Sequence, residues 1–135
     1  MTIVPEMTEL SRPYWEGARD HKLMLQFCTD CDACWHPPMP CCPQCHSMRY
    51  EWRAVSGRGV VYSYIDVHHS VHPSTDSWVP YRVCLVDLDE GPRIVSSWRH
   101  DIDDSGLVPD ARVKVVFDEI APGVVLPRFT PEDRT

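Results

Sequence analysis

Alternation of apolar and polar residues runs through the second half of the chain. Turns are expected at 57–59, which holds two glycines, and at 89–92, which ends in Gly-Pro. Within 80–88 both faces carry apolar residues, with Val83 and Leu85 on one and Cys84, Val86 and Leu88 on the other. Segments of this kind, with a period of two, predict strands at 60–69, 80–88, 93–98, 112–119 and 124–129.

The number of expected strands sets the architecture of this half. Five or so strands with one short irregular insertion favour a small Greek-key barrel of the OB type, because a sandwich needs more strands. The stretch 55–129 is long enough for one small core. We therefore expect a single compact unit, or two very small lobes of which the barrel is the larger.

The start of the chain predicts a short helix. A serine followed by Pro13 is typical of a first helical turn, and the pattern continues to Arg19. Tyr14, Trp15 and Ala18 would lie on or near one face. We expect that face to pack on the body of the protein, although an aromatic helix could also dock on a partner.

Between two short strands expected at 23–27 and 48–52 lies a cysteine-rich stretch whose four prolines exclude a helix. It holds two Cys-x-x-Cys pairs with ten residues between them. That spacing lets each pair wrap one edge of a tetrahedral ion, which predicts a structural zinc ribbon with a closed four-sulfur shell. A lobe this small needs the metal for stability. The predicted ligands are Cys28, Cys31, Cys42 and Cys45.

Other readings of the cysteines stay open. Cys34 extends the first pair to a Cys-x-x-Cys-x-x-Cys run, although the fourth cysteine and proline of the ferredoxin pattern are missing. Cys41 stands beside Cys42, so either extra thiol could replace a predicted ligand. Disulfides are disfavoured because seven cysteines would leave one unpaired and nothing marks the chain as secreted. We also expect Trp35 and Trp52 to shield the metal centre.

The charge balance disfavours nucleic acid as a partner. The formal net charge is −7, and four thiolates on one Zn²⁺ would make it −9 (−7 − 4 + 2). Such a surface repels phosphate backbones, and the lysines and arginines form no basic cluster. No apolar run approaches the roughly 20 residues of a membrane span, and no leader opens the chain. We therefore expect a cytoplasmic protein.

No motif predicts an independent active site. His68 and His69 would point to opposite sides of a strand end, so together with His72 we interpret them as loop and surface residues. Cys84 lies within a strand and is expected to be a buried thiol rather than a nucleophile. The acidic residues Asp101, Asp103 and Asp104 have no basic partner nearby in the sequence and are expected to form a solvated loop.

Several short motifs follow one another in a fixed order along the chain. They are a short aromatic helix followed by Leu23-x-Leu25-Gln26-x-Cys28-x-x-Cys31, Pro37-Pro38, Cys42-Pro43-x-Cys45, Ser56-Gly57-x-Gly59-x-Val61-Tyr62-Ser63-Tyr64, Leu88-Asp89-Glu90-Gly91-Pro92-Arg93 and Leu126-Pro127-x-Phe129. Together they resemble the zinc-ribbon/OB-fold proteins that act as accessory subunits of thiolase-like enzymes. The resemblance covers nearly the whole chain from Ser11, but the glycine that usually follows each Cys-x-x-Cys knuckle is replaced by Asp32 and His46.

The resemblance implies an N-terminal helical segment (1–22), a rubredoxin-like zinc ribbon (23–53), an OB-fold barrel (54–130) and a tail (131–135). It also implies a thiolase, sterol-carrier-type thiolase or retro-aldolase partner that carries the catalytic residues and acts on acyl-CoA. This subunit would stabilise that partner and help to form the CoA site. Candidate contacts to CoA phosphates are Lys22, Arg49, Arg53 and Arg58.

Two alternatives to an accessory subunit remain at this point. An OB barrel can bind single-stranded nucleic acid by stacking bases on aromatic side chains, for which Tyr62, Tyr64 and Tyr81 are candidates, but the acidity disfavours it. A stand-alone acyltransferase or hydrolase is the weaker alternative.

Overall fold

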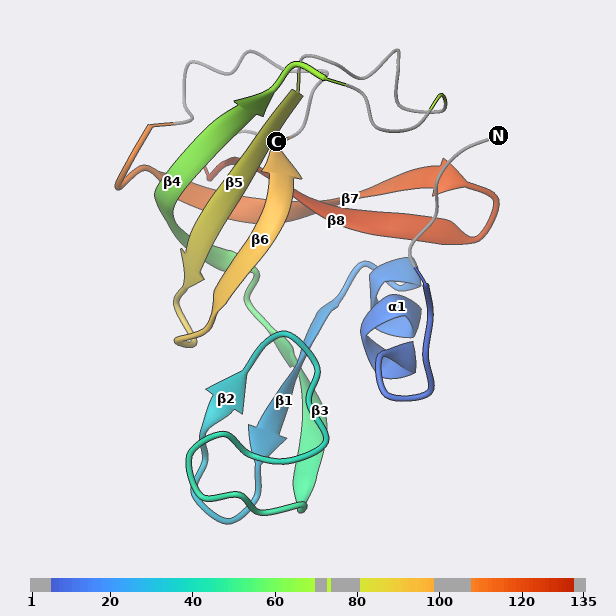
Figure 1. Cartoon of the computed structure of the whole chain (residues 1–135), viewed down its shortest axis with the longest axis vertical. Coiled ribbons are helices and arrows are strands. Elements are labelled where there is room, and N and C mark those ends of the chain that lie inside the picture. Colours follow the sequence, from blue (N-terminus) through green and yellow to red (C-terminus); the bar gives the residue numbers. More distant parts are fainter. Residues whose placement is uncertain (1–5, 70–72, 74–80, 99–107, 133–135) are drawn as a thin grey trace.

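The computed structural model describes residues 6–69, 73, 81–98 and 108–132 (Figure 1). One helix, α1 (Arg12–Arg19), precedes a small sheet of three strands, β1 (Leu23–Cys28), β2 (Cys34–Trp35) and β3 (Tyr50–Val55). Five more strands follow: β4 (Arg58–Val67), β5 (Tyr81–Leu88), β6 (Arg93–Trp98), β7 (Arg112–Ala121) and β8 (Val124–Pro131). Every strand predicted from the sequence is present, with ends shifted by three residues or fewer. β2 is an addition, because two residues cannot display a period.

Strands β4 to β8 close into a barrel in the order β4-β5-β6-β8-β7, with β7 paired back to β4. Neighbouring strands run antiparallel except β6 and β8, which are parallel. Closure gives each of these strands a partner on both sides. Side chains that are at most 1 % exposed fill the interior, among them Val61, Val86, Ile94, Val113 and Phe129. The predicted five-stranded OB-fold barrel is confirmed.

The ribbon is a separate antiparallel sheet with the order β2-β1-β3 (Figure 1). β1 is its central strand, and its burial changes along its length. Leu23 and Leu25 are at most 2 % exposed and pack with residues of the barrel, whereas Cys28 belongs to a second, smaller cluster near the cysteines. β1 therefore links the barrel to the cysteine-rich end of the ribbon.

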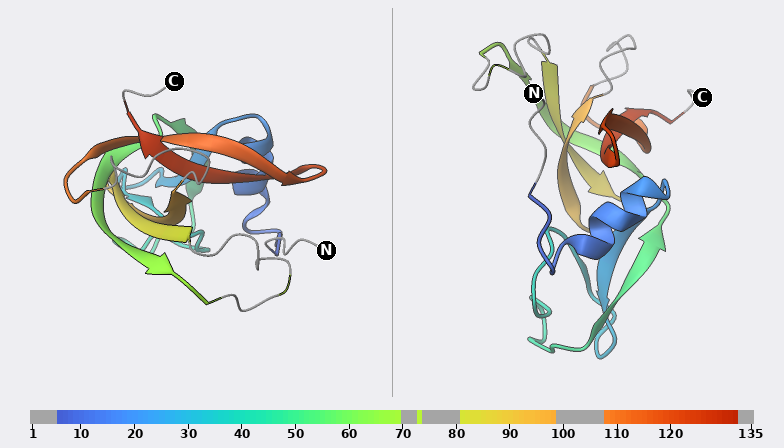
Figure 2. Two further views of the ribbon diagram at one scale, coloured as in Figure 1. Left: turned by 90° about the horizontal axis from the view of Figure 1, so that it is seen from above. Right: turned by 90° about the vertical axis from the view of Figure 1, so that its right-hand side faces the viewer.

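Helix α1 lies beside the ribbon and below the hairpin formed by β7 and β8 (Figures 1 and 2). It packs against β1 and β8 through Tyr14, Gly17 and Ala18, which are buried. The Arg19 Nε donates a hydrogen bond of 2.8 Å to the carbonyl oxygen of Gly123 at the hairpin tip. The expectation that this helix face packs on the body is confirmed. No helix in the described part of the chain is long and apolar enough to cross a membrane.

The main core is shared by all three parts of the protein. It joins Tyr14 of α1 and Leu23 of β1 to the barrel residues around Phe129. Trp52 of β3 packs at its margin, so the expectation that this tryptophan shields the metal centre is wrong. Trp52 is on the same face of β3 as Tyr50, which packs on the cysteine cluster, but it lies two residues nearer to the end of the strand that packs on the shared core.

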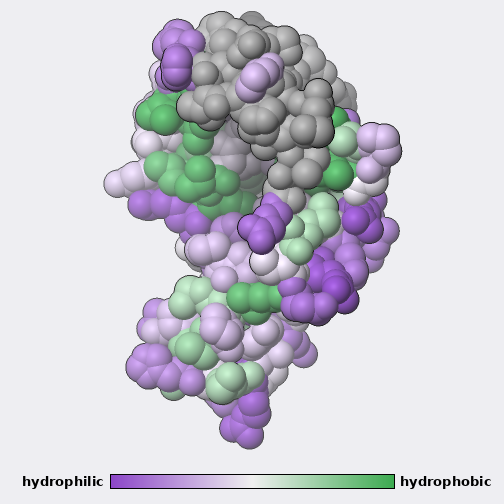
Figure 3. All heavy atoms as spheres, turned by 45° about the vertical axis from the view of Figure 1, so that its right-hand side comes forward, coloured by the Kyte–Doolittle hydropathy of each residue, from purple (hydrophilic) through white to green (hydrophobic). Residues whose placement is uncertain are grey.

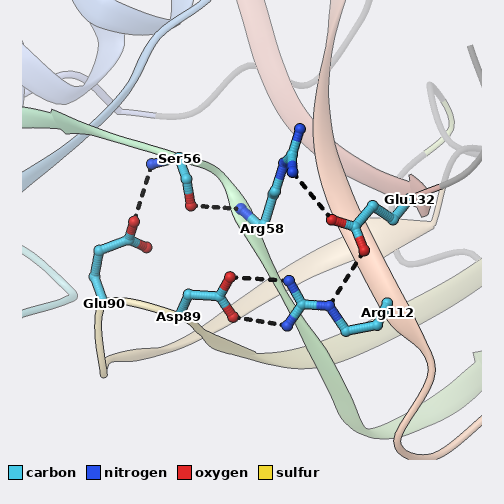
Figure 4. Close-up of polar contacts among 6 residues, drawn as sticks. All are labelled: Ser56, Arg58, Asp89, Glu90, Arg112 and Glu132. Atoms are coloured by element: carbon cyan, nitrogen blue, oxygen red, sulfur yellow. Dashed lines mark hydrogen bonds and ion pairs between the residues drawn. The ribbon is translucent and has the colours of Figure 1, made fainter.

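The link between ribbon and barrel is tightly packed. Gly57 has a left-handed backbone (φ +74°), and a Cβ there would lie 2.3 Å from Cγ1 of Val115. The turn predicted at 57–59 is shorter than expected, because β4 begins at residue 58 and Gly59 is part of it. Just before, the Ser56 N–H donates a hydrogen bond of 3.0 Å to Oε2 of Glu90 (Figure 4). The link is thereby tied to the β5–β6 turn.

A network of ion pairs extends this connection around the base of the barrel (Figure 4). The Arg112 guanidinium donates two hydrogen bonds, of 2.8 and 2.9 Å, to the two carboxylate oxygens of Asp89. Its Nε donates a third, of 3.2 Å, to Glu132, which also pairs with Arg58 at 3.4 Å. These side chains join β4, β7, the β5–β6 turn and the end of β8. About half of the Arg112 side chain is exposed, so solvent screens the pairs.

Candidate metal centre

Each Cys-x-x-Cys pair forms one tight turn. In the first, the Asp32 N–H donates to the Cys28 carbonyl oxygen at 3.0 Å, and the Cys28 N–H donates to the carbonyl oxygen of Ala33 at 2.8 Å. The second turn repeats the first between the His46 N–H and the Cys42 carbonyl oxygen, at 2.9 Å. The two knuckles are therefore copies of one local structure.

The residue that closes each turn has a left-handed backbone. Asp32 has φ 63° and His46 has φ 64°. Glycine is the usual residue at such a position, but aspartate and histidine are among the residues that adopt this conformation several times more often than others do. The replacement of both glycines therefore leaves the knuckle geometry intact.

The two turns face each other and bring four sulfur atoms together. The Sγ atoms of Cys28, Cys31, Cys42 and Cys45 all lie within 4.8 Å of one another. Cys28 Sγ is 3.6 Å from Cys45 Sγ, and Cys31 Sγ is 3.6 Å from Cys42 Sγ. Four sulfurs bound at about 2.3 Å to one tetrahedral Zn²⁺ stand about 3.8 Å apart. The group therefore fits zinc, whereas a disulfide needs sulfurs about 2 Å apart.

Burial and hydrogen bonding are unequal within each knuckle. The first cysteine of each pair is buried, while Cys31 and Cys45 are exposed. The Asp30 N–H points to Cys28 Sγ at 3.4 Å, and the Gln44 N–H points to Cys42 Sγ at 3.3 Å. Backbone N–H groups directed at a sulfur favour its thiolate form, which is the form that binds zinc.

Packing beneath the knuckles holds the site in place. The Trp35 ring is 5 % exposed, belongs to the cluster of Cys28 and Cys42, and meets the Tyr50 ring edge-on at 5.8 Å. The expectation that Trp35 shields the metal centre is thereby confirmed.

A buried glutamine anchors the loop between the knuckles. Gln26, which is 1 % exposed, donates a hydrogen bond of 2.7 Å to the Met39 carbonyl oxygen. Its amide oxygen accepts one of 2.9 Å from the Met39 N–H. The side chain thus pairs with the backbone of the proline-rich loop much as a neighbouring strand would. Sequence reasoning missed this role, although a glutamine in a strand of apolar residues is a signal for a satisfied buried amide.

The two additional cysteines lie outside the four-sulfur group. Cys34 is half-buried in β2 and packs at the margin of the main core, and Cys41 is half-buried beside Cys42. The structure therefore brings together the four sulfurs predicted as ligands, and neither of the two alternatives joins them.

The four cations suggested for CoA are not gathered into one site. Arg49 pairs with Asp30 near the first knuckle at 3.0 Å. Arg53 on β3 pairs with Glu51 and lies over the Phe27 ring, 4.8 Å from its centroid. Arg58 pairs with Glu132 at the base of the barrel, and Lys22 is exposed after α1.

The remaining candidates give no catalytic constellation among the described residues. Cys84 is fully buried, and burial raises the pKa of its thiol to about 12, as expected for a packing residue. His68 and His69 are exposed, while His72 and the acidic residues at 101, 103 and 104 lie outside the described residues.

The two tyrosines of β4 proposed for base stacking are already in contact with arginines. Arg93 lies 3.5 Å from the ring centroid of Tyr62, and Arg82 lies 4.9 Å from that of Tyr64. One face of each ring is therefore occupied within the protein.

Comparisons with known proteins cover both halves of the chain. A family model described as the ChsH2 rubredoxin-like zinc ribbon domain matches residues 15–51. A second, described as the ChsH2 C-terminal OB-fold domain, matches residues 52–118. The ribbon is thus a zinc ribbon by its family as well as by its four clustered cysteines, and its cofactor is structural zinc.

Individual relatives agree with these matches. A probable enoyl-CoA hydratase alpha subunit of Thermomonospora curvata is 39% identical over 123 residues, which are 87% of this chain and 36% of that protein. The chain thus spans about a third of that relative's length. A DUF35 domain-containing scaffold protein of Methanothermobacter thermautotrophicus is 28% identical, with 84% of this chain and 85% of that protein covered.

A solved structure described as the Ltp2-ChsH2(DUF35) aldolase superposes with a TM-score of 0.82 at 35% identity. The superposition covers 94% of this chain and 98% of the matched chain. Since both parts of the chain match ChsH2 domains and a solved relative is matched over almost its full length, the chain belongs to the ChsH2 (DUF35) family of zinc-ribbon/OB-fold proteins.

Proposed function

We propose that this chain is a non-catalytic accessory subunit that binds a thiolase-like enzyme and helps to form its acyl-CoA site. The partner, a thiolase, a sterol-carrier-type thiolase or a retro-aldolase, carries the catalytic residues. The observation that carries the proposal is the similarity, over 98% of the matched chain, to a structure described as the Ltp2-ChsH2(DUF35) aldolase. The description of an archaeal relative as a scaffold protein supports the same role.

The geometry of the metal centre supports a structural role for this subunit. A tetrahedral shell of four thiolates leaves no coordination position for a substrate or a water molecule. The zinc would therefore shape the ribbon rather than take part in the reaction. Within the described residues, the buried thiol of Cys84 has no basic partner that would activate it.

The proposed contribution to the CoA site rests on the exposed cations. Lys22, Arg49, Arg53 and Arg58 would meet CoA phosphates when the partner is bound. Three of them already hold a carboxylate, which a phosphate would have to displace. Lys22 is exposed and is the first residue to test, with Lys22→Gln expected to raise the KM for acyl-CoA without lowering kcat.

Co-expression tests the proposal. A pull-down from the native host first identifies the proteins that this chain binds. A thiolase-like protein found there is then co-produced with this chain, and the two are purified through a tag on one of them. We expect a stable complex that turns over acyl-CoA and a partner that loses activity or precipitates when produced alone. Turnover by this chain in isolation would overturn the proposal, and so would a partner that is equally active without it.

A further inference from the structure

The barrel carries apolar side chains on its outer surface as well as inside. Strand register places Ile65 beside Val83, and Leu85 beside Val95, all on the face opposite the core residues Cys84 and Val86. A bulge in β4 adds the Tyr62 side chain at the lower end of this face. We refer to Tyr62, Ile65, Val83, Leu85 and Val95 as the outer-face patch.

Three members of the outer-face patch are exposed to solvent, and the other two, Val83 and Leu85, are half-buried. Val95 is 64% exposed, Ile65 61% and Tyr62 53%. Hydrophobic surface is visible on the barrel lobe in Figure 3, beside the residues drawn in grey. Among the described elements, α1 packs against β1 and β8 and leaves β4, β5 and β6 to the other side (Figures 1 and 2). A strand that is apolar on both faces is typical of a sheet covered on both sides.

Charges at the edge of the patch are neutralised within the protein. Arg93 Nε donates a hydrogen bond of 2.6 Å to Asp87, and the guanidinium lies over the Tyr62 ring. These contacts place the Tyr62 ring and the Arg93 guanidinium against each other. Tyrosine and arginine are the residues most often found, with tryptophan, at the energetic centre of protein interfaces, and preorganised side chains lose less entropy on binding.

The charge of the whole chain decides between two occupants. A second copy would bring together two chains of formal charge −7 each, more negative still with zinc bound, and they would repel each other. A different protein with an apolar area and a net positive charge would be attracted instead. The α1 helix, the other apolar element, has already buried its face against the body.

We propose that the outer-face patch is the docking surface for the thiolase-like subunit, which presents to it an apolar area on a surface of net positive charge. This inference rests on the proposed function and names the part of this chain that makes the contact. The barrel, rather than the aromatic helix or the tip of the ribbon, then carries the main interface.

The test compares charge insertions at exposed apolar positions. Val95→Glu and Ile65→Glu place a carboxylate in the patch on two different strands. Met48→Glu, on the ribbon at a side chain that is 75% exposed, is the matched control. Zinc content and the thermal midpoint are measured first for each variant. Affinity for the purified thiolase-like subunit that the pull-down identifies is then measured by calorimetry.

Each outcome bears on one proposal. We expect about a hundredfold weaker binding for Val95→Glu and Ile65→Glu, because a buried unpaired charge is costly, and less than threefold for Met48→Glu. If the wild-type chain binds but the patch variants bind equally well, or if Met48→Glu alone disrupts binding, the surface assignment is overturned. If the wild-type chain itself forms a dimer that the patch variants dissociate, the second copy is the occupant. Failure of the wild type to bind at all counts against the proposed function instead.

Discussion

The buried amide of Gln26 offers the sharpest test of how the ribbon is held. Its two hydrogen bonds, of 2.7 and 2.9 Å, satisfy both the carbonyl oxygen and the N–H of Met39 in the loop between the knuckles. Gln26→Met keeps the length and flexibility of the side chain and removes both partners. Two backbone groups of the half-buried Met39 would then lack their hydrogen-bond partner.

The expected loss follows from the number of groups left unpaired. Each unsatisfied buried group costs about 1–3 kcal/mol, and the gain from burying a thioether offsets part of the sum. We expect a net loss of about 3 kcal/mol in the free energy of unfolding, or roughly 10 °C in the thermal midpoint. Because zinc binding is coupled to the folding of the ribbon, the same loss would weaken the apparent zinc affinity about a hundredfold.

A chromophoric chelator that competes for zinc measures the affinity, and circular dichroism follows thermal unfolding. Gln44→Met is the matched control, since Gln44 is exposed and only its backbone N–H approaches a sulfur. The control should bind zinc like the wild type. If Gln26→Met also binds zinc within about threefold of the wild type and melts within about 2 °C of it, the anchoring role inferred from Met39 is wrong.

Three further predictions concern the ligand set, acid stability and the link. Cys42→Ser should abolish the single bound zinc in elemental analysis, whereas Cys41→Ser should retain it. Burial lowers the pKa of His36 from 6.5 to about 4, so the unfolded state takes up a proton first as the pH falls through 6.5. The wild type should therefore lose about 2 kcal/mol of its free energy of unfolding through His36 between pH 7 and pH 5, and His36→Phe should not show this loss. Urea unfolding at the two pH values measures the difference. Gly57→Ala should lower the free energy of unfolding by about 2–4 kcal/mol, because the backbone there is left-handed and the new Cβ would clash with Val115. Gly123→Ala, with φ +76° and nothing within 4 Å, should cost less; equal losses would exclude the clash.

The cysteine spacing carried most of the information on the ribbon. Two pairs separated by a proline-rich stretch can meet around one ion, and the sulfurs of Cys28 and Cys45 do lie 3.6 Å apart. Spacing could not show what holds the intervening loop in place. Gln26 binds the backbone N–H and carbonyl oxygen of Met39, and any residue type would offer that carbonyl oxygen. Spacing also could not assign Trp52, whose surroundings depend on how far along β3 the cysteine cluster ends and the shared core begins.

Alternation carried the information on the barrel. The observed ends of these strands lie close to the predicted ones, because a strand that buries one face shows apolar residues at every second position. The apolar outer face of β5 was visible in the sequence as well, but periodicity cannot distinguish a covered face from an exposed one. The cations suggested for CoA show the limit of the method. Arg49 and Arg58 are placed by ion pairs with Asp30 and Glu132, which lie 19 and 74 residues away in the chain.

The shared core has a consequence for any attempt to divide the protein. The two family matches meet between residues 51 and 52, inside β3. A ribbon fragment cut at that point would keep two of the six residues of β3, the strand that pairs with β1, and would leave Leu23 and Leu25 facing water. We expect neither piece to be a useful module for fusion or exchange. The boundary between the two family matches is not a boundary between independently folded domains.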